Sequence, residues 1–131
     1  MATIFSRIIN GEIPAYKIAE DEKYFAFLDI NPLTKGHTLV VPKVEVDYLF
    51  DVDDNTLAGM MVFAKKVAKA IKATVECTRI GVLVLGLEIP HAHLHLVPLV
   101  NEVDLNIKKP KVKLTKEEFE EIAAAIRKNF V

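Results

Sequence analysis

The chain has 131 residues, 51% hydrophobic and 27% charged, which fits one globular domain and excludes a disordered chain. Its 17 basic and 18 acidic side chains give a net charge of −1, so no general basic field is available to attract nucleic acid. The single cysteine excludes a disulfide within the chain and suits a reducing compartment. No apolar run approaches the roughly 20 residues of a membrane span. We therefore expect a soluble, cytoplasmic protein that binds neither nucleic acid nor membrane.

The first part of the chain predicts a short helix followed by three strands. Apolar residues at one-turn spacing favour a helix over residues 3–9, ending at Asn10-Gly11. The strands are rich in aromatic and β-branched residues, and turn residues separate them. They span residues 15–19, 24–30 and 37–41. Asp29 would share a strand face with Phe25 and Phe27, which is an unusual position for a carboxylate.

A long helix is predicted to begin after Asp53 or Asp54, either of which can cap it. Its apolar stripe repeats every three to four residues, as expected for a helix with one buried face. The stripe consists of Leu57, Met60, Met61, Ala64, Val67, Ala68 and Ile71. We interpret both methionines as core residues.

The remainder of the chain predicts two further strands and a last helix. Residues 79–87 are apolar at odd and even positions alike, which indicates a central strand covered on both faces. Residues 101–113 form a polar loop, and Thr115 with Glu118 is a capping box that begins the last helix. This order of elements predicts an α+β fold with a five-stranded, mainly antiparallel sheet.

Three of the four histidines occupy alternate positions in the segment from His91 to His95. On a strand, the imidazoles of His91, His93 and His95 would share one face, roughly 7 Å apart. Ala92, Leu94 and Leu96 would then point into an apolar layer. A row of imidazoles is unsuited to a core and well suited to chemistry.

Four interpretations of this row are open. The histidines could be incidental surface residues, or they could bind zinc, with His37 or Glu88 as a third ligand. They could also act at phosphorus, because imidazole forms covalent nucleotidyl intermediates and neighbouring imidazoles can neutralise phosphate oxygens. The same pocket could bind a nucleotide without turnover. The chain has neither a cysteine pair nor a second histidine pair to complete a closed metal site, so we favour catalysis.

The segment His91-Ala92-His93-Leu94-His95-Leu96-Val97 resembles the His-φ-His-φ-His-φ-φ signature of the histidine triad (HIT) superfamily of nucleotide hydrolases and transferases. Ile4 to Pro14, Phe27 to Lys43 and Gly86 to Pro98 resemble three blocks of that family, in the same order. The resemblance implies a HIT-like fold and a single domain over residues 1–131. Its core would be residues 3–100, with a C-terminal loop and helix over 101–131.

The resemblance also implies an activity. HIT proteins of this kind hydrolyse or transfer a nucleoside monophosphate from a phosphoramidate or a dinucleoside polyphosphate, through a nucleotidyl-histidine and without a metal. By matched position, His93 would attack the α-phosphorus and His95 would contact the phosphate and the leaving atom. His91 would orient His93, and His37 would support the triad. We expect a purine nucleotide substrate, no cofactor and a homodimer; the alternative is a nucleotide-binding protein with little or no turnover.

Further positions would bind the substrate. Asp29 would hold the ribose hydroxyls, although from the residues alone a turn-forming aspartate before Asn31-Pro32 is the other interpretation. Glu88 would lie beside the phosphates, which it would repel unless it is protonated or paired with an imidazole. The base pocket implied by the resemblance consists of Phe5, Ile8, Phe27 and Leu28.

The chain departs from the family pattern at two other places. Many bacterial relatives carry Cys-x-x-Cys near the start for a structural zinc, whereas this chain has Thr3-Ile4-Phe5-Ser6, so we predict no bound metal. Leu87 stands where relatives often have Gln, and residues 82–85 are all apolar. Fewer polar groups are therefore available to hold phosphates, and the imidazoles would do more of that binding.

Overall fold

The computed structural model describes residues 2–130. A five-stranded antiparallel sheet lies at its centre, with the strand order β1-β2-β3-β5-β4. The strands are β1 (Lys17–Glu20), β2 (Tyr24–Leu28), β3 (Thr38–Pro42), β4 (Arg79–Leu83) and β5 (Leu94–Leu99). The helices are α1 (Ile4–Ile9), α2 (Asp54–Thr74) and α3 (Lys116–Asn129), with 3-10 turns at Leu49–Asp51 and Glu102–Leu105. The α+β prediction is confirmed.

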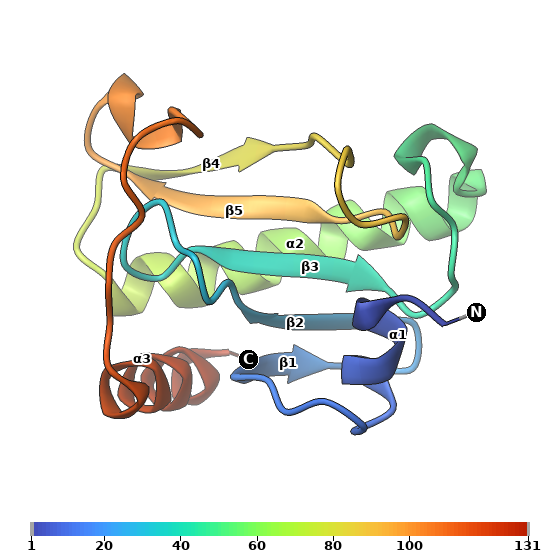
Figure 1. The fold of residues 1–131 in the computed structure, drawn as a ribbon, viewed down its shortest axis with the longest axis horizontal. Coiled ribbons are helices and arrows are strands. Elements are labelled where there is room, and N and C mark those ends of the chain that lie inside the picture. The colour runs from blue at the N-terminus through green and yellow to red at the C-terminus, as the bar shows by residue number, and fades with distance from the viewer. Residues whose placement is uncertain (1, 131) are drawn as a thin grey trace.

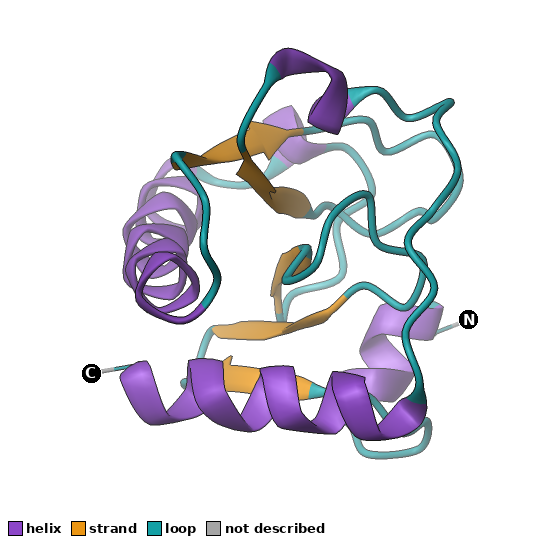
Figure 2. Ribbon diagram, turned by 90° about the vertical axis from the view of Figure 1, so that its left-hand side faces the viewer, coloured by secondary structure: helices purple, strands orange, loops and turns teal. Residues whose placement is uncertain are grey.

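Helix α2 lies on one side of the sheet and the short α1 on the other, whereas α3 runs past the β1 end of the sheet and packs against α2 (Figures 1 and 2). The larger apolar cluster joins the sheet to α2 and α3, and it includes Met60, Val67, Ile71, Leu96 and Ile126. The smaller cluster lies under α1 and consists of Phe5, Phe25, Phe27, Leu39 and Val41. None of the helices described over residues 2–130 is long and apolar enough to cross a membrane.

Each helix begins where a side chain can accept a hydrogen bond from a free backbone N–H. Asp53, rather than Asp54, caps α2 by accepting from the Thr56 amide. Thr115 and Glu118 form the predicted capping box at the start of α3. Thr3 caps α1 by accepting from the Ser6 amide. The predicted helix starts are therefore confirmed.

The prediction for residues 79–87 is wrong in position and in length. Strand β4 ends at Leu83 and lies at the edge of the sheet, paired only with β5. Val82, Val84 and Leu85 are 48%, 40% and 43% exposed. A strand that is apolar on both sides can be central or can present a bare edge, and the sequence pattern is the same. Leu83 pairs with His95 near the start of β5, so the chain leaves the sheet after Leu83 and returns through residues 84–93.

The prediction that Met61 is a core residue is also wrong. Met61 is 51% exposed, whereas Met60 is completely buried. Successive residues on an α-helix are rotated by about 100°, which places Met61 beyond the edge of the buried face that Met60, Ala64 and Ile71 share. Phe63 and Ala70 complete the buried face of α2 instead.

Candidate active site

A cavity of about 550 Å³ opens on the α1 side of the sheet. The register across the sheet places Phe27 opposite Leu39 and Leu39 opposite His95, so these three residues share one face. His37 immediately precedes β3, and Asp29 immediately follows β2. The Asp29 amide donates to the His37 carbonyl oxygen at 3.0 Å, which brings both side chains to the same end of the cavity.

The spacing of the histidines predicted one strand through all three, but the structure does not form a continuous strand there. Only His95 belongs to β5; His93 directly precedes it, and His91 lies in a bend after Pro90. The apolar half of the prediction is confirmed, because Ala92, Leu94 and Leu96 all lie in the larger core cluster. The bend changes the direction of the first imidazole: His91 is completely buried, whereas His93 and His95 line the cavity with ring centroids 5.0 Å apart.

The protonation of His93 follows from its backbone partner. Its Nδ1 lies 2.7 Å from the carbonyl oxygen of His91, which can only accept, so Nδ1 carries the proton. The Nε2 atom of the neutral ring is then left with a free lone pair. Burial lowers the pKa of His93, which keeps the ring neutral at neutral pH. The edge of Phe5 packs against this ring at a centroid distance of 5.0 Å.

A second chain of hydrogen bonds fixes the tautomers of the other two imidazoles. The Leu33 amide donates to Nδ1 of His37 at 2.9 Å, so the proton of a neutral His37 is on Nε2. That Nε2–H donates to Nδ1 of His95 at 2.9 Å, and His95 therefore carries its proton on Nε2. Burial lowers the pKa of His37 to about 3 and that of His95 to about 4, so both rings are neutral at neutral pH.

Asp29 makes the turn contact expected from the residues alone, and it also borders the cavity. One carboxylate oxygen accepts from the Asn31 amide at 2.8 Å, as in a turn-forming aspartate. The other oxygen lies 3.6 Å from Nε2 of His37 and borders the cavity. Because His37 is neutral, this contact is between a charge and a ring N–H rather than an ion pair. Burial raises the pKa of Asp29, opposed by the Asn31 amide and by the charge of Lys111.

The predicted base-pocket residues differ in where they point. Phe5, Ile8 and Phe27 line the cavity, and the rings of Phe5 and Phe27 meet edge to face at 5.5 Å. Leu28 borders the cavity, but its buried side chain belongs to the larger cluster on the other side of the sheet. Glu88 lines the mouth from the exposed loop between β4 and β5.

Asp29, His37 and His95 place one potential metal-ligand atom each within 4.8 Å of one another. The tautomers oppose a metal at this point. Nε2 of His37 already carries a proton, and removing it by a tautomer switch would leave the buried Leu33 amide facing an Nδ1–H. Among residues 2–130 no buried side-chain nitrogen or oxygen lacks a partner, so Asp29, His37 and His95 hold no buried atom left over for an ion.

One part of this cavity could not be predicted from the sequence. Ile107 and Lys111 line it from the loop after β5, which a hydrogen bond between the Val112 amide and the Pro32 carbonyl ties to the site at 2.9 Å. Among the described residues that line the cavity, Lys111 bears the only permanent positive charge. Its charge lowers the pKa of His37, after the larger effects of burial and of His95.

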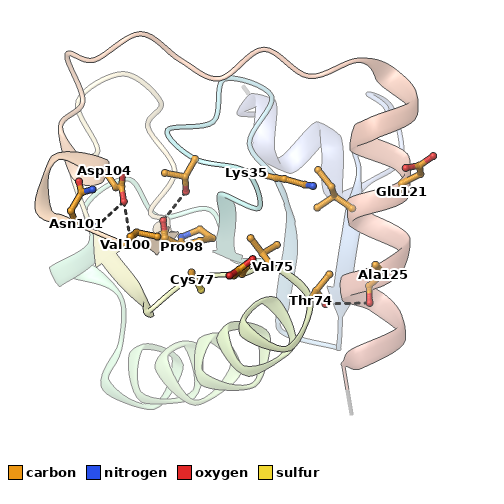
Figure 3. A pocket seen from close by; sticks show the side chains of 13 residues that line it. Lys35, Thr74, Val75, Cys77, Pro98, Val100, Asn101, Asp104, Glu121 and Ala125 are labelled. Atoms are coloured by element: carbon orange, nitrogen blue, oxygen red, sulfur yellow. Dashed lines mark hydrogen bonds between the residues drawn. The ribbon is translucent and has the colours of Figure 1, made fainter.

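A second cavity, of about 640 Å³, lies between α3, the end of α2 and the end of β5 (Figure 3). Its lining includes Lys35, Cys77 and Glu121 but none of the histidines. Asp104 on its rim already accepts from the Val100 and Asn101 amides, at 2.8 and 3.0 Å. The first cavity, with its oriented imidazoles, is therefore the candidate active site.

A family model of the HIT domain matches residues 10–102. The chain belongs to this family. The HIT-like protein of Bartonella henselae has the same fold, with a TM-score of 0.83 and 32% identity over 97% of this chain and 95% of that one. The resemblance stated from the histidine signature is thus confirmed.

Two HIT relatives bear the name of an activity. The chain is 34% identical to the adenosine 5'-monophosphoramidase of Schizosaccharomyces pombe, over 97% of this chain and all of the relative (100%). It is 39% identical to the adenosine 5'-monophosphoramidase of Saccharomyces cerevisiae, over 77% of this chain and 65% of the relative. These HIT relatives support a nucleotide-hydrolase type of role for this chain.

Proposed function

We propose that this protein is a metal-independent nucleotidyl hydrolase or transferase that attacks the α-phosphate of a nucleoside phosphoramidate. The observation that carries the proposal is the free Nε2 lone pair of His93, held toward the cavity by the Nδ1–H bond to the His91 carbonyl. The names of the two yeast relatives favour the phosphoramidate over a dinucleoside polyphosphate. The expected purine preference remains part of the proposal.

In the first step, Nε2 of His93 forms a bond to the α-phosphorus, and the bond from phosphorus to the leaving nitrogen breaks. The electron pair of that bond departs with the leaving nitrogen, which takes up a proton from the open side of the cavity and leaves as the neutral amine. His93 becomes positively charged as it attacks, and its Nδ1–H bond to the His91 carbonyl strengthens at that moment. In the second step, water attacks phosphorus, and the electron pair of the P–Nε2 bond returns to Nε2, so that His93 is neutral again. The nucleoside monophosphate is released, and one proton of the attacking water passes to solvent.

The surrounding residues hold the substrate. The Nε2–H of His95 donates a hydrogen bond to a phosphate oxygen, because its other nitrogen is occupied by His37. The free oxygen of Asp29 accepts from ribose hydroxyls, and Phe5, Ile8 and Phe27 offer apolar surface to the base. Since the imidazoles are neutral, Lys111 supplies the permanent charge that offsets the phosphate.

The test is to incubate the protein with an AMP-amine substrate and measure AMP release, with and without excess chelator. His93→Ala and His93→Asn should abolish turnover and retain nucleotide binding, since neither removes the wall of the cavity. Undiminished AMP release by these variants would refute the role of His93. Binding without turnover by the unaltered protein would support the alternative, a nucleotide-binding protein. Loss of activity with chelator, together with stoichiometric zinc, would refute metal independence.

We also propose a homodimer that uses the free edge of β4. The edge strand exposes unpaired backbone groups beside Val82 and Val84, which are 48% and 40% exposed. Val82→Glu should therefore give monomers in sedimentation velocity, because a carboxylate would be buried at the interface. Val103→Glu, at a 57% exposed valine outside the sheet, is the matched control. A monomeric unaltered protein would contradict the proposal.

A further inference from the structure

We propose that Thr3 is a positioning residue for the catalytic centre: its hydroxyl fixes the ring of His91, whose carbonyl in turn orients His93. Ser6 and Glu45 hold Thr3 in place. The catalytic meaning of this arrangement rests on the proposed function, whereas the orientation of the two rings does not. Thr3 is 88 positions away from His91 in the sequence, and it does not line the cavity.

The contacts of His91 fix which of its ring nitrogens carries the proton. Nε2 of His91 lies 2.8 Å from the Pro42 carbonyl oxygen, so it donates, and the Nδ1 of a neutral ring must accept. The Thr3 hydroxyl lies 2.8 Å from that Nδ1 and is the donor it requires. The same Thr3 oxygen accepts from the Ser6 amide at 3.0 Å, as the cap of α1.

Glu45 binds both Thr3 and Ser6. One of its oxygens accepts from the Thr3 amide and from the Ser6 hydroxyl, both at 2.7 Å. The Thr3 hydroxyl then has two acceptors within reach, the Ser6 oxygen at 3.3 Å and Nδ1 of His91 at 2.8 Å. The shorter contact is to His91, whose Nδ1 needs a donor, so we assign the Thr3 proton to His91. Glu45 comes three residues after Pro42, at the end of β3. The same stretch of chain therefore binds Nε2 of His91 directly, through the Pro42 carbonyl, and holds Thr3 through Glu45.

Two contacts couple the orientation of His91 to that of His93. The His91 carbonyl accepts the Nδ1–H of His93 at 2.7 Å, and Phe5 packs edge-on against both rings, at 5.7 and 5.0 Å. His91 is completely buried, so its Nδ1 has no water to replace a lost hydroxyl donor. A shift of His91 would therefore move the carbonyl and turn the attacking nitrogen of His93.

The experiment compares three variants at two threonine caps, of which two lose the hydroxyl and one retains it. Thr3→Val removes both the cap of α1 and the donor to His91, and Thr3→Ser retains both. Thr115→Val is the matched control, because it removes a threonine cap from α3, away from the histidines. For each protein, AMP release is measured with an AMP-amine substrate, and the tautomers of the rings are read from ¹⁵N NMR; the chain has four histidines to assign.

We expect Thr3→Val to lower kcat about 10- to 100-fold with KM little changed, since small misplacements of a reacting group cost about that much. Its His93 ring should show both neutral tautomers in place of the Nδ1–H form. Thr3→Ser should behave as the unaltered protein, and Thr115→Val should lose thermal stability alone.

Equal kcat values for Thr3→Val and Thr115→Val, with an unchanged His93 tautomer, would overturn the proposal. A His91 that is not the neutral Nε2–H tautomer in the unaltered protein would overturn it too, and this measurement requires no variant to fold. If the unaltered protein releases no AMP, the proposed function fails, and the ring spectra still decide whether Thr3 positions His93.

Discussion

The neutral, buried state of His37 predicts a specific loss of stability in acid. The pKa of this ring is about 3 in the folded protein and 6.5 as an ordinary histidine, and its side chain is only 3% exposed. Below pH 6.5 the unfolded chain therefore binds a proton that the folded protein does not, so stability falls as the pH falls. Each unit of difference corresponds to about 1.4 kcal/mol.

Between pH 7.5 and pH 4.5 the unfolded ring becomes almost fully protonated, about two units below its ordinary pKa, while the folded ring stays neutral. His37 alone should therefore lower the free energy of unfolding by about 3 kcal/mol over this range. The assay is urea unfolding at four pH values for the unaltered protein and for His37→Gln, whose amide can still accept from Leu33. Carboxylates titrate in both proteins, so the difference between the two curves isolates the imidazole.

Parallel curves for the two proteins would refute the reasoning, because they would mean that His37 titrates alike in the folded and unfolded states. A difference of opposite sign, with the unaltered protein gaining stability in acid relative to His37→Gln, would show a protonated His37 paired with Asp29. That result would also remove the argument for the Nε2–H tautomer of His95.

Three further predictions concern the cavity and the fold. Lys111→Met should raise KM roughly tenfold with kcat little changed, and it should weaken the salt dependence of kcat/KM, because the cavity loses its permanent cation; an unchanged KM would contradict this role. Asp29→Asn should keep the turn to Asn31 and the thermal stability but weaken nucleotide binding about 10- to 100-fold in calorimetry, and unchanged affinity would favour a purely structural aspartate. Gly59→Ala should destabilise the protein by about 1–3 kcal/mol in urea unfolding, because a methyl group there would overlap the Tyr24 hydroxyl; a neutral effect would show that Tyr24 can move aside.

The sequence predicted where helices and strands begin more accurately than it predicted which elements lie next to one another. Capping residues and periodicity act within a few residues, so the starts of α2 and α3 and the inward direction of Leu94 and Leu96 could be read directly. The place of β4 at the sheet edge could not, since it depends on which strand pairs with β5. Met61 failed for a related reason: a stripe wide enough to include it exceeds the face that the sheet can cover.

The candidate site divides in the same way. The alternate spacing singled out His93 and His95, and the family resemblance gave His37 and Asp29 their roles. The structure brings all four residues to one cavity. Lys111 escaped prediction because a loop determines its place, and no periodicity marks a loop. The role of Thr3 escaped as well, since the spacing of Thr3 and Ser6 indicated only a missing metal site. Its contact with His91 spans 88 positions and exists only in the folded chain.

The hydrogen-bond chain from Leu33 through His37 to His95 has a direction, and it ends at an amide that cannot release its proton. This chain therefore cannot relay protons to the cavity. If His95 gave its Nε2 proton to a departing group, no proton could pass from Leu33 through His37 to replace it. Every proton consumed in turnover must enter from the open side of the cavity, with the substrate or from water. An amine that carries its own proton as it leaves is suited to such a site, whereas a strongly basic leaving group arriving without one would find no donor there.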